Sequence, residues 1–213
     1  MPYTGGMTSL QQEAPPPPPP ISSETRSPSG SAANFLYPLS EFFACPPPQD
    51  VVRLEGQGKP MPEPYRSLLV HERDMTSTLE RFHEETLVLR PVVRKREGDN
   101  LFRQVVLIGE RTGTPWEFGA IRIDLGAFGA AARGEILAAR RPLGSILARH
   151  EVAYESRPRH YFQVPSDQCM GQLLDFSGSC PLYGRQNVLS SPTGRPLAEV
   201  VEILPPIPQT LAG

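Results

Sequence analysis

The sequence lacks the features that define several large protein classes. Its 213 residues contain no apolar run near the roughly 20 residues that cross a bilayer, which excludes a membrane-spanning protein. The formal net charge is only −2 and the isoelectric point is about 6.1, so no overall basic field is available to attract phosphate backbones. We therefore expect no membrane span and no nucleic-acid partner.

Cysteine is also scarce. Cys45, Cys169 and Cys180 form an odd set without a CxxC spacing, which predicts neither a disulfide framework nor a zinc site. The four histidines show no ligand spacing on one helix face, so we expect no metal. Met1–Gln12 has no basic residue before an apolar stretch, as a secretory leader would have, and we expect a cytoplasmic protein.

Common catalytic motifs are missing as well. The sequence contains no HExxH, GxSxG, GxGxxG or Walker A pattern, and residues 109–113 lack the Gly-Lys pair that would hold phosphate. Ser177 and Ser179 have no histidine or acid placed by sequence to activate them. We expect both segments to be turns or loops.

Proline is abundant instead. The chain has 26 prolines, with one run at Pro15–Pro20, and residues 1–34 cannot bury enough apolar surface to offset their ordering entropy. We expect a disordered tail there, with docking of a polyproline II segment on a partner as the alternative. An apolar patch and linker follow over 35–63, then a globular domain over 64–206 and a short tail over 207–213.

Within 64–206 the apolar spacing predicts helices and strands in separate groups. Helices are expected over 64–71, over 74–83 and, as a pair, between 128 and 150. Strands are expected over 86–96, 101–109, 115–124, 151–164, 182–191 and 195–204, most of them joined by tight turns. This order predicts an α+β domain built on an antiparallel sheet.

One charged residue interrupts the apolar strand expected at 101–109. By the period-two alternation of a strand, Arg103 shares a face with Leu101, Val105 and Leu107. A guanidinium on an apolar face needs a partner. Its fork geometry suits a carboxylate, either from the protein or from a ligand.

The last expected strand offers two carboxylates on opposite faces. Glu199 shares its face with Val201 and Ile203, whereas Glu202 shares the other face with Val200. Residue types alone favour a structural ion pair between Arg103 and one of these glutamates. A ligand site at Arg103 is the alternative.

Four sequence blocks then occur in a fixed order. Leu68–Glu80 reads LLVHERDMTSTLE, followed by LFRQVVL with PWEFG, by PLG at 142–144, and by YGR leading through GRP to EILPP. In this order the blocks resemble the chorismate pyruvate-lyases, also called 4-hydroxybenzoate synthases. The resemblance covers about 64–206 and departs from the family at Asp74, where the family has serine.

The resemblance implies a chorismate lyase-like fold, in which helical flaps cover a ligand pocket on an antiparallel sheet of about six strands. It also implies a lyase that eliminates pyruvate from chorismate to give 4-hydroxybenzoate or a related hydroxybenzoate, with no metal and no organic cofactor. The partner of such a protein is a small molecule.

Site residues follow from the same resemblance. Arg103 would hold the ring carboxylate, and Glu202 would act at the para oxygen, which makes these two the candidate catalytic residues. Met75 and Leu143 would line the pocket, with ordinary core positions as the alternative. Arg185 could neutralise the pyruvyl carboxylate.

Two alternatives stay open. Counting on from Gly194–Pro196 without a gap makes Glu199 a rival to Glu202 as the glutamate that contacts the substrate. The fold also resembles the effector domain of bacterial transcription regulators, so a non-catalytic protein that binds a small aromatic carboxylate is the second functional hypothesis.

Overall fold

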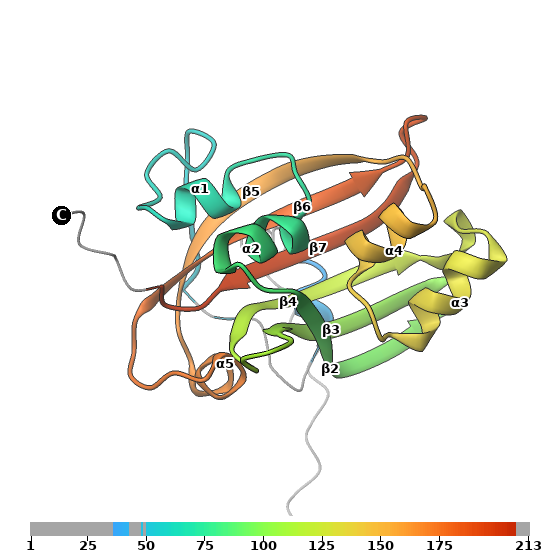
Figure 1. Cartoon of the computed structure of the whole chain (residues 1–213). Helices are drawn as coiled ribbons and strands as arrows, with labels where there is room; N and C mark the ends of the chain where they lie inside the picture. Colours follow the sequence, from blue (N-terminus) through green and yellow to red (C-terminus); the bar gives the residue numbers. More distant parts are fainter. Residues whose placement is uncertain (1–35, 43–47, 49, 208–213) are drawn as a thin grey trace, which may run out of the picture.

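A seven-stranded antiparallel sheet organises the chain (Figure 1). The computed structural model describes residues 36–42, 48 and 50–207. The strands are β1 (Val52–Arg53), β2 (Leu87–Glu97), β3 (Asn100–Gly109), β4 (Pro115–Asp124), β5 (Glu155–Pro165), β6 (Pro181–Ser190) and β7 (Pro196–Leu204). They lie in the order β1-β5-β6-β7-β4-β3-β2. The predicted antiparallel α+β fold is confirmed, and the strand beyond the expected six is the two-residue β1, which pairs with β5.

Four helices cover one face of this sheet, and a fifth packs on the other face. The helices are α1 (Tyr65–Leu69), α2 (Met75–His83), α3 (Ala130–Ala138), α4 (Leu143–Arg149) and α5 (Gln168–Leu174), with 3-10 turns η1 (Leu39–Glu41) and η2 (Leu125–Ala127). In Figure 1, α2 and α4 lie in front of the sheet and the blue segment around η1 lies behind it. The sequence predicted the first four helices but not α5, whose start is capped by Asp167 through a 2.7 Å bond from the Met170 amide.

The start of α2 is fixed by its own sequence. The Asp74 side chain accepts a hydrogen bond from the Ser77 amide at 3.2 Å, as a helix N-cap does. The helix ends at Glu84, which adopts a left-handed conformation with φ 52. Because the cap sets where the first turn begins, Met75 lies at the first helical position, facing the sheet with 4% exposure.

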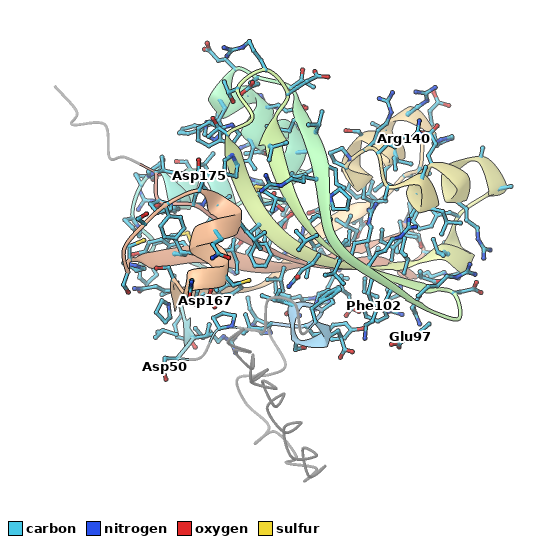
Figure 2. All side chains as sticks on the ribbon, turned by 90° about the horizontal axis from the view of Figure 1, so that it is seen from below. Asp50, Glu97, Phe102, Arg140, Asp167 and Asp175 are labelled. Carbon is cyan, nitrogen blue, oxygen red and sulfur yellow. The ribbon has the colours of Figure 1, made fainter. Side chains whose placement is uncertain are left out.

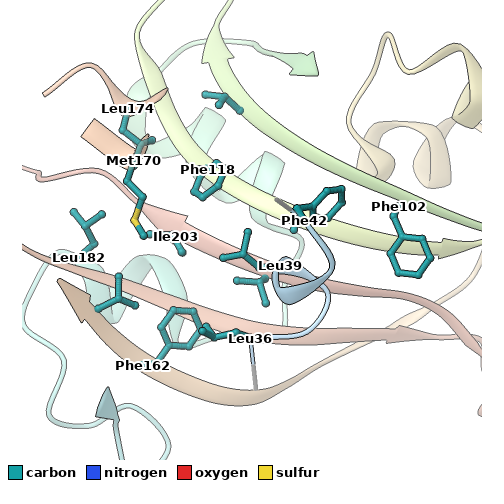
Figure 3. Close-up of a cluster of buried hydrophobic side chains, with 14 residues drawn as sticks. Leu36, Leu39, Phe42, Phe102, Phe118, Phe162, Met170, Leu174, Leu182 and Ile203 are labelled. Carbon is teal, nitrogen blue, oxygen red and sulfur yellow. The ribbon is translucent and has the colours of Figure 1, made fainter. Parts of the chain in front are cut away.

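The face opposite α2 and α4 is closed by apolar packing (Figure 3). Leu36, Leu39 and Phe42 pack with Phe118 and other buried side chains of the sheet. Figure 2 shows the two sides from below, with Phe102 toward the η1 segment and Arg140 among the helices of the other side. The apolar patch expected near residue 35 therefore covers a sheet face rather than the edge of the domain. The predicted tail over 1–34 lies outside the described residues.

Two further expectations concern cysteines and membranes. Cys169 in α5 is disulfide-bonded while Cys180 is a free thiol, so a single bridge forms where the sequence predicted no disulfide framework. An odd cysteine count argues against a framework of several bridges but leaves room for one. Within the described part of the chain, no helix is long and apolar enough for a membrane span, and no three metal-binding side chains cluster.

Candidate functional site

A pocket lies between the sheet and the first turns of α2 and α4. Its empty volume, with the open solvent at the mouth included, is about 630 Å³. Strands β2, β3, β4, β6 and β7 form its floor, and Met75 and Leu143 lie at the helix starts that cover it. This arrangement agrees with the expected pocket under helical flaps.

Strand register places the polar residues of the floor in adjacent rows. One row runs from Asn187 across β7 and β4 to Arg103, since Val200 pairs with Asn187 and Ile121 pairs with both Val200 and Arg103. The next row holds Glu202 opposite Gly119, and Glu117 lies two residues further along β4. Side chains two residues apart on a strand share a face, so these groups converge on one pocket.

Arg103 is buried without a carboxylate partner among the described residues. Its side chain lines the pocket with 1% exposure, and Nη1 donates a long 3.5 Å hydrogen bond to the Ile136 carbonyl near the end of α3. The Nε atom has no hydrogen-bond partner. Burial lowers the pKa of Arg103 to about 10, so the guanidinium keeps its charge at neutral pH. The expected ion pair with Glu199 or Glu202 is therefore wrong.

Glu202 faces the pocket and pairs with Arg185 behind it. The Arg185 Nε donates to Glu202 Oε2, and the two side chains are 0% and 8% exposed. Arg185 Nη1 donates to the carbonyls of Leu69 at 3.0 Å and His71 at 2.9 Å. Arg185 thus fixes Glu202 and also the chain between α1 and α2 that leads to the pocket.

The sequence hypothesis gave Arg185 a direct role toward the pyruvyl carboxylate. In the structure Arg185 is not among the pocket-lining residues, and its Nη2 is engaged with the Arg73 carbonyl at 3.4 Å. Its geometry is that of a support for Glu202. A direct contact with a ligand stays a prediction that this geometry does not favour.

The rival glutamate lies on the opposite face of the same strand. Glu199 Oε2 accepts a 2.9 Å hydrogen bond from Arg122 Nη1, and both side chains are partly exposed. Glu199 does not line the pocket, whereas Glu202 does. The alternation expected for the last strand is correct, and it places Glu202 rather than Glu199 in the pocket that Arg103 also lines.

The helix starts above the floor lie against each other. A Cβ atom at Gly144 would lie 2.6 Å from the Asp74 Oδ1 atom, so glycine permits the close approach of α4 to the cap of α2. Met75 and Leu143 enter the pocket from these two turns and are 4% and 6% exposed. Both residues therefore line the pocket, as predicted.

Two pocket residues were missed by sequence reasoning. Glu117 is 4% exposed, and its Oε2 has no hydrogen-bond partner. Burial, with the nearby charge of Glu202, raises the pKa of Glu117 well above its usual range. Asn187 donates to Ser156 Oγ at 3.0 Å, but its Oδ1 also has no partner. Period-two alternation assigns each residue to a face, but only the strand register shows that this face is the pocket floor.

Comparisons with known proteins bear on the fold. The sequence matches no family model and no curated protein sequence. Among solved structures, PhnF from Mycobacterium smegmatis is similar over 64% of this chain and 65% of PhnF, at 10% identity and a TM-score of 0.50. The separately solved effector domain of PhnF gives 64% and 90% coverage, 10% identity and a TM-score of 0.49. A GntR-family transcriptional regulator from Bacillus cereus gives 59% and 99% coverage, 12% identity and a TM-score of 0.41.

The likeness to PhnF shows the fold of this chain, which is an α+β antiparallel sheet of the chorismate lyase-like type. The chain spans 65% of the length of PhnF, slightly under two thirds. At 10% identity this likeness shows the fold and carries no information on activity. The fold prediction is thus confirmed, and activity has to be argued from the pocket itself.

Proposed function

We propose that the pocket binds a small ring carboxylate through Arg103 and that the chain eliminates pyruvate from chorismate, leaving 4-hydroxybenzoate. The observation that carries the proposal is the buried guanidinium of Arg103, which faces the pocket with an unpartnered Nε and no carboxylate from the described residues. A buried charge without a counter-ion is costly, and an anionic ligand would compensate it with charge-assisted hydrogen bonds.

The position of Glu202 supports a ligand with a polar group at its other end. Arg103 on β3 and Glu202 on β7 lie on either side of β4 and are offset by two residues along it, so their backbones are roughly 12 Å apart. Because both side chains reach inward over a mostly apolar floor, the space between their charged ends suits one six-membered ring. The Glu202 carboxylate would accept a hydrogen bond from a hydroxyl opposite the ring carboxylate.

The residue set is compatible with the elimination. Aromatisation of the ring supplies the driving force, so the site mainly has to orient chorismate and handle one proton. Arg103 would anchor the ring carboxylate, Met75 and Leu143 would hold the ring, and Glu202 would lie near the C4 hydrogen and hydroxyl. No metal or organic cofactor enters these steps.

A second candidate is a non-catalytic protein that binds a ring monocarboxylate. It is favoured by a specific observation on charge. Chorismate carries two carboxylates, and Arg185, the other arginine near the pocket, has its donors engaged by Glu202 and by backbone carbonyls. Arg103 alone would then balance one carboxylate, which suits 4-hydroxybenzoate better than chorismate.

Turnover and binding measured together separate these candidates. The protein is incubated with chorismate while pyruvate is followed by a coupled dehydrogenase, and 4-hydroxybenzoate binding is measured by calorimetry. Equal production of pyruvate and 4-hydroxybenzoate supports the lyase. Binding without turnover supports the second candidate.

Arg103→Met should weaken 4-hydroxybenzoate binding on the order of 100-fold and remove turnover, whereas Arg122→Met should leave both intact because Arg122 pairs with Glu199 on the opposite face. Binding of wild-type strength in a folded Arg103→Met protein would overturn both candidates. The matched arginine variant controls for the general effect of removing a positive charge from the sheet.

A further inference from the structure

We propose that Glu117 is held protonated in the pocket as its proton donor, and that it gives its proton to the enolpyruvyl ether oxygen as that group leaves. The inference rests on the proposed lyase function and assigns a residue that the sequence resemblance did not. It starts from the placement of Glu117 in the floor of the pocket, which Glu202 and Arg103 also line.

Glycine at position 119 makes the room for this carboxyl. Gly119 lies directly opposite Glu202 on the neighbouring strand. A Cβ atom at Gly119 would lie 3.1 Å from Glu117 Oε1 and 2.7 Å from the Val201 carbonyl oxygen. The Glu117 carboxyl therefore lies over the backbone of Gly119, on the side of the pocket where Glu202 also reaches in.

The charges around Glu117 favour its neutral form. Glu202 on β7 and Asp74 at the start of α2 both raise the pKa of Glu117, and the charge of Arg185 on β6 opposes them. Arg185 is already committed to Glu202. Burial acts in the same direction and is the largest cause. Arg185 is paired with Glu202, so of these two neighbouring carboxyls Glu117 is the one that carries the proton.

The unpartnered oxygen of Glu117 points to a ligand. A buried polar atom without a hydrogen bond costs free energy that an apolar side chain would avoid, and Glu117 Oε2 is such an atom. A neighbouring pocket atom, Asn187 Oδ1, is in the same condition. A ligand with oxygen atoms on the ring would satisfy the protonated Glu117 as an acceptor and Asn187 as a donor.

The proposed step balances in atoms and protons. The bond between ring carbon C3 and the ether oxygen breaks, and Glu117 gives its proton to that oxygen, so enolpyruvate leaves and tautomerises to pyruvate. Glu202 takes the proton from C4, and the electron pair of that C–H bond forms the new double bond of the aromatic ring. Glu117 ends as a carboxylate and Glu202 as an acid. Proton transfer between these neighbouring carboxyls restores the starting state.

The test compares the isosteric variant Glu117→Gln with the wild-type protein. Glutamine can donate a hydrogen bond but cannot transfer a proton, so kcat for chorismate should fall by about 100-fold or more while KM changes by only a few-fold. Glu199→Gln, on the opposite face of β7, is the matched control and should keep wild-type kcat. Infrared difference spectra on adding 4-hydroxybenzoate should show the carbonyl band of a protonated carboxyl, absent in Glu117→Gln.

Each outcome decides between the inference and the function on which it rests. Wild-type turnover with unchanged kcat in Glu117→Gln, or an ionised Glu117 at neutral pH, overturns the proton-donor role and leaves the lyase standing. No wild-type turnover, together with a Glu117 band that shifts on binding, overturns the lyase and retains Glu117 as a donor to the ligand. No turnover and no band overturn both.

Discussion

The two faces of the sheet are built from the same strands but differ in the polarity of their buried side chains. On the face covered by residues 36–42, side chains such as Phe118, Phe162 and Ile203 are fully buried and apolar. On the face under α2 and α4, three buried atoms of Arg103, Glu117 and Asn187 have no hydrogen-bond partner. The first face is packed mainly with apolar side chains, and under the proposed function a ligand would supply the missing partners of the second.

This difference shows how one antiparallel sheet separates stability from function. The alternation of side chains lets each strand give one set of residues to the closed core and the other set to the pocket. Removing an apolar side chain from the closed face should cost folding free energy. Removing an unpartnered polar group from the pocket face should cost binding and leave folding intact or improved. The ion pair of Arg185 and Glu202 is the exception, because it belongs to the pocket face and is fully satisfied.

That exception predicts the largest effect. Glu202→Gln leaves Arg185 buried without its counter-ion, so the free energy of unfolding should fall by about 3–5 kcal/mol. Glu199→Gln breaks a partly exposed pair and should cost about 1 kcal/mol or less. Urea unfolding of the two variants measures both values. Equal effects would show that the two faces of β7 are not electrostatically different.

The closed face predicts the next effect. Leu39 is 0% exposed and packs from η1 onto the sheet, so Leu39→Ala should lower the free energy of unfolding by about 2–5 kcal/mol. Its affinity for 4-hydroxybenzoate should stay within a few-fold of wild type, because Leu39 and the pocket lie on opposite faces. Calorimetry at a temperature where the variant is folded checks the affinity. A large loss of binding would mean that the two faces are coupled.

The pocket face predicts the opposite pattern. Arg103→Met should weaken 4-hydroxybenzoate binding on the order of 100-fold, because a buried charged hydrogen-bond donor is lost. Its unfolding free energy should be equal to or above that of the wild type, since methionine fills similar space without a desolvated charge. Thermal unfolding without ligand checks the second point. Strong destabilisation would reveal a structural partner for Arg103.

The sequence predicts the features of the two faces that depend on residues close together in the chain, and it misses those that depend on contacts between distant residues. Alternation along single strands correctly separated Glu199 from Glu202, and Asp74 correctly marked the start of α2, because both signals are local. The pairing of Arg185 with Glu202 joins β6 to β7, and the Arg185 bonds to Leu69 and His71 span more than 100 residues. Such contacts depend on register and on packing, which a local pattern does not contain.

The ion pair first expected for Arg103 failed for the same reason. Both glutamates of the last strand find nearer arginines on adjacent strands, Arg122 and Arg185, once β7 pairs between β4 and β6. The role of Glu117 could not be read from alternation alone, because its neighbour Glu202 is distant in sequence. The fold was therefore predictable from local spacing and the resemblance, whereas the charge arrangement of the pocket was not.

Glu117 gives the smallest effect and the sharpest test of the pocket face. In the folded protein its pKa is raised, so above about pH 4.5 the native state holds a proton that the unfolded chain has lost. The free energy of unfolding should therefore fall as pH rises from there toward the native pKa, by at most about 1.4 kcal/mol per pH unit. Glu117→Gln removes this slope.

The slope is best measured by urea unfolding from about pH 5 to pH 8, as the difference between the wild type and Glu117→Gln. Burial lowers the pKa of His71 and His83 to about 4, so these side chains add stability as pH rises toward about 6.5, but they do so equally in both proteins and cancel in the difference. Glu199→Gln should retain the wild-type slope. The same pH dependence in the wild type and in Glu117→Gln would contradict the prediction. It would mean that Glu117 ionises in the folded protein, with a cation or water reaching the pocket. The two faces of the sheet would then differ less than their unpartnered buried atoms indicate.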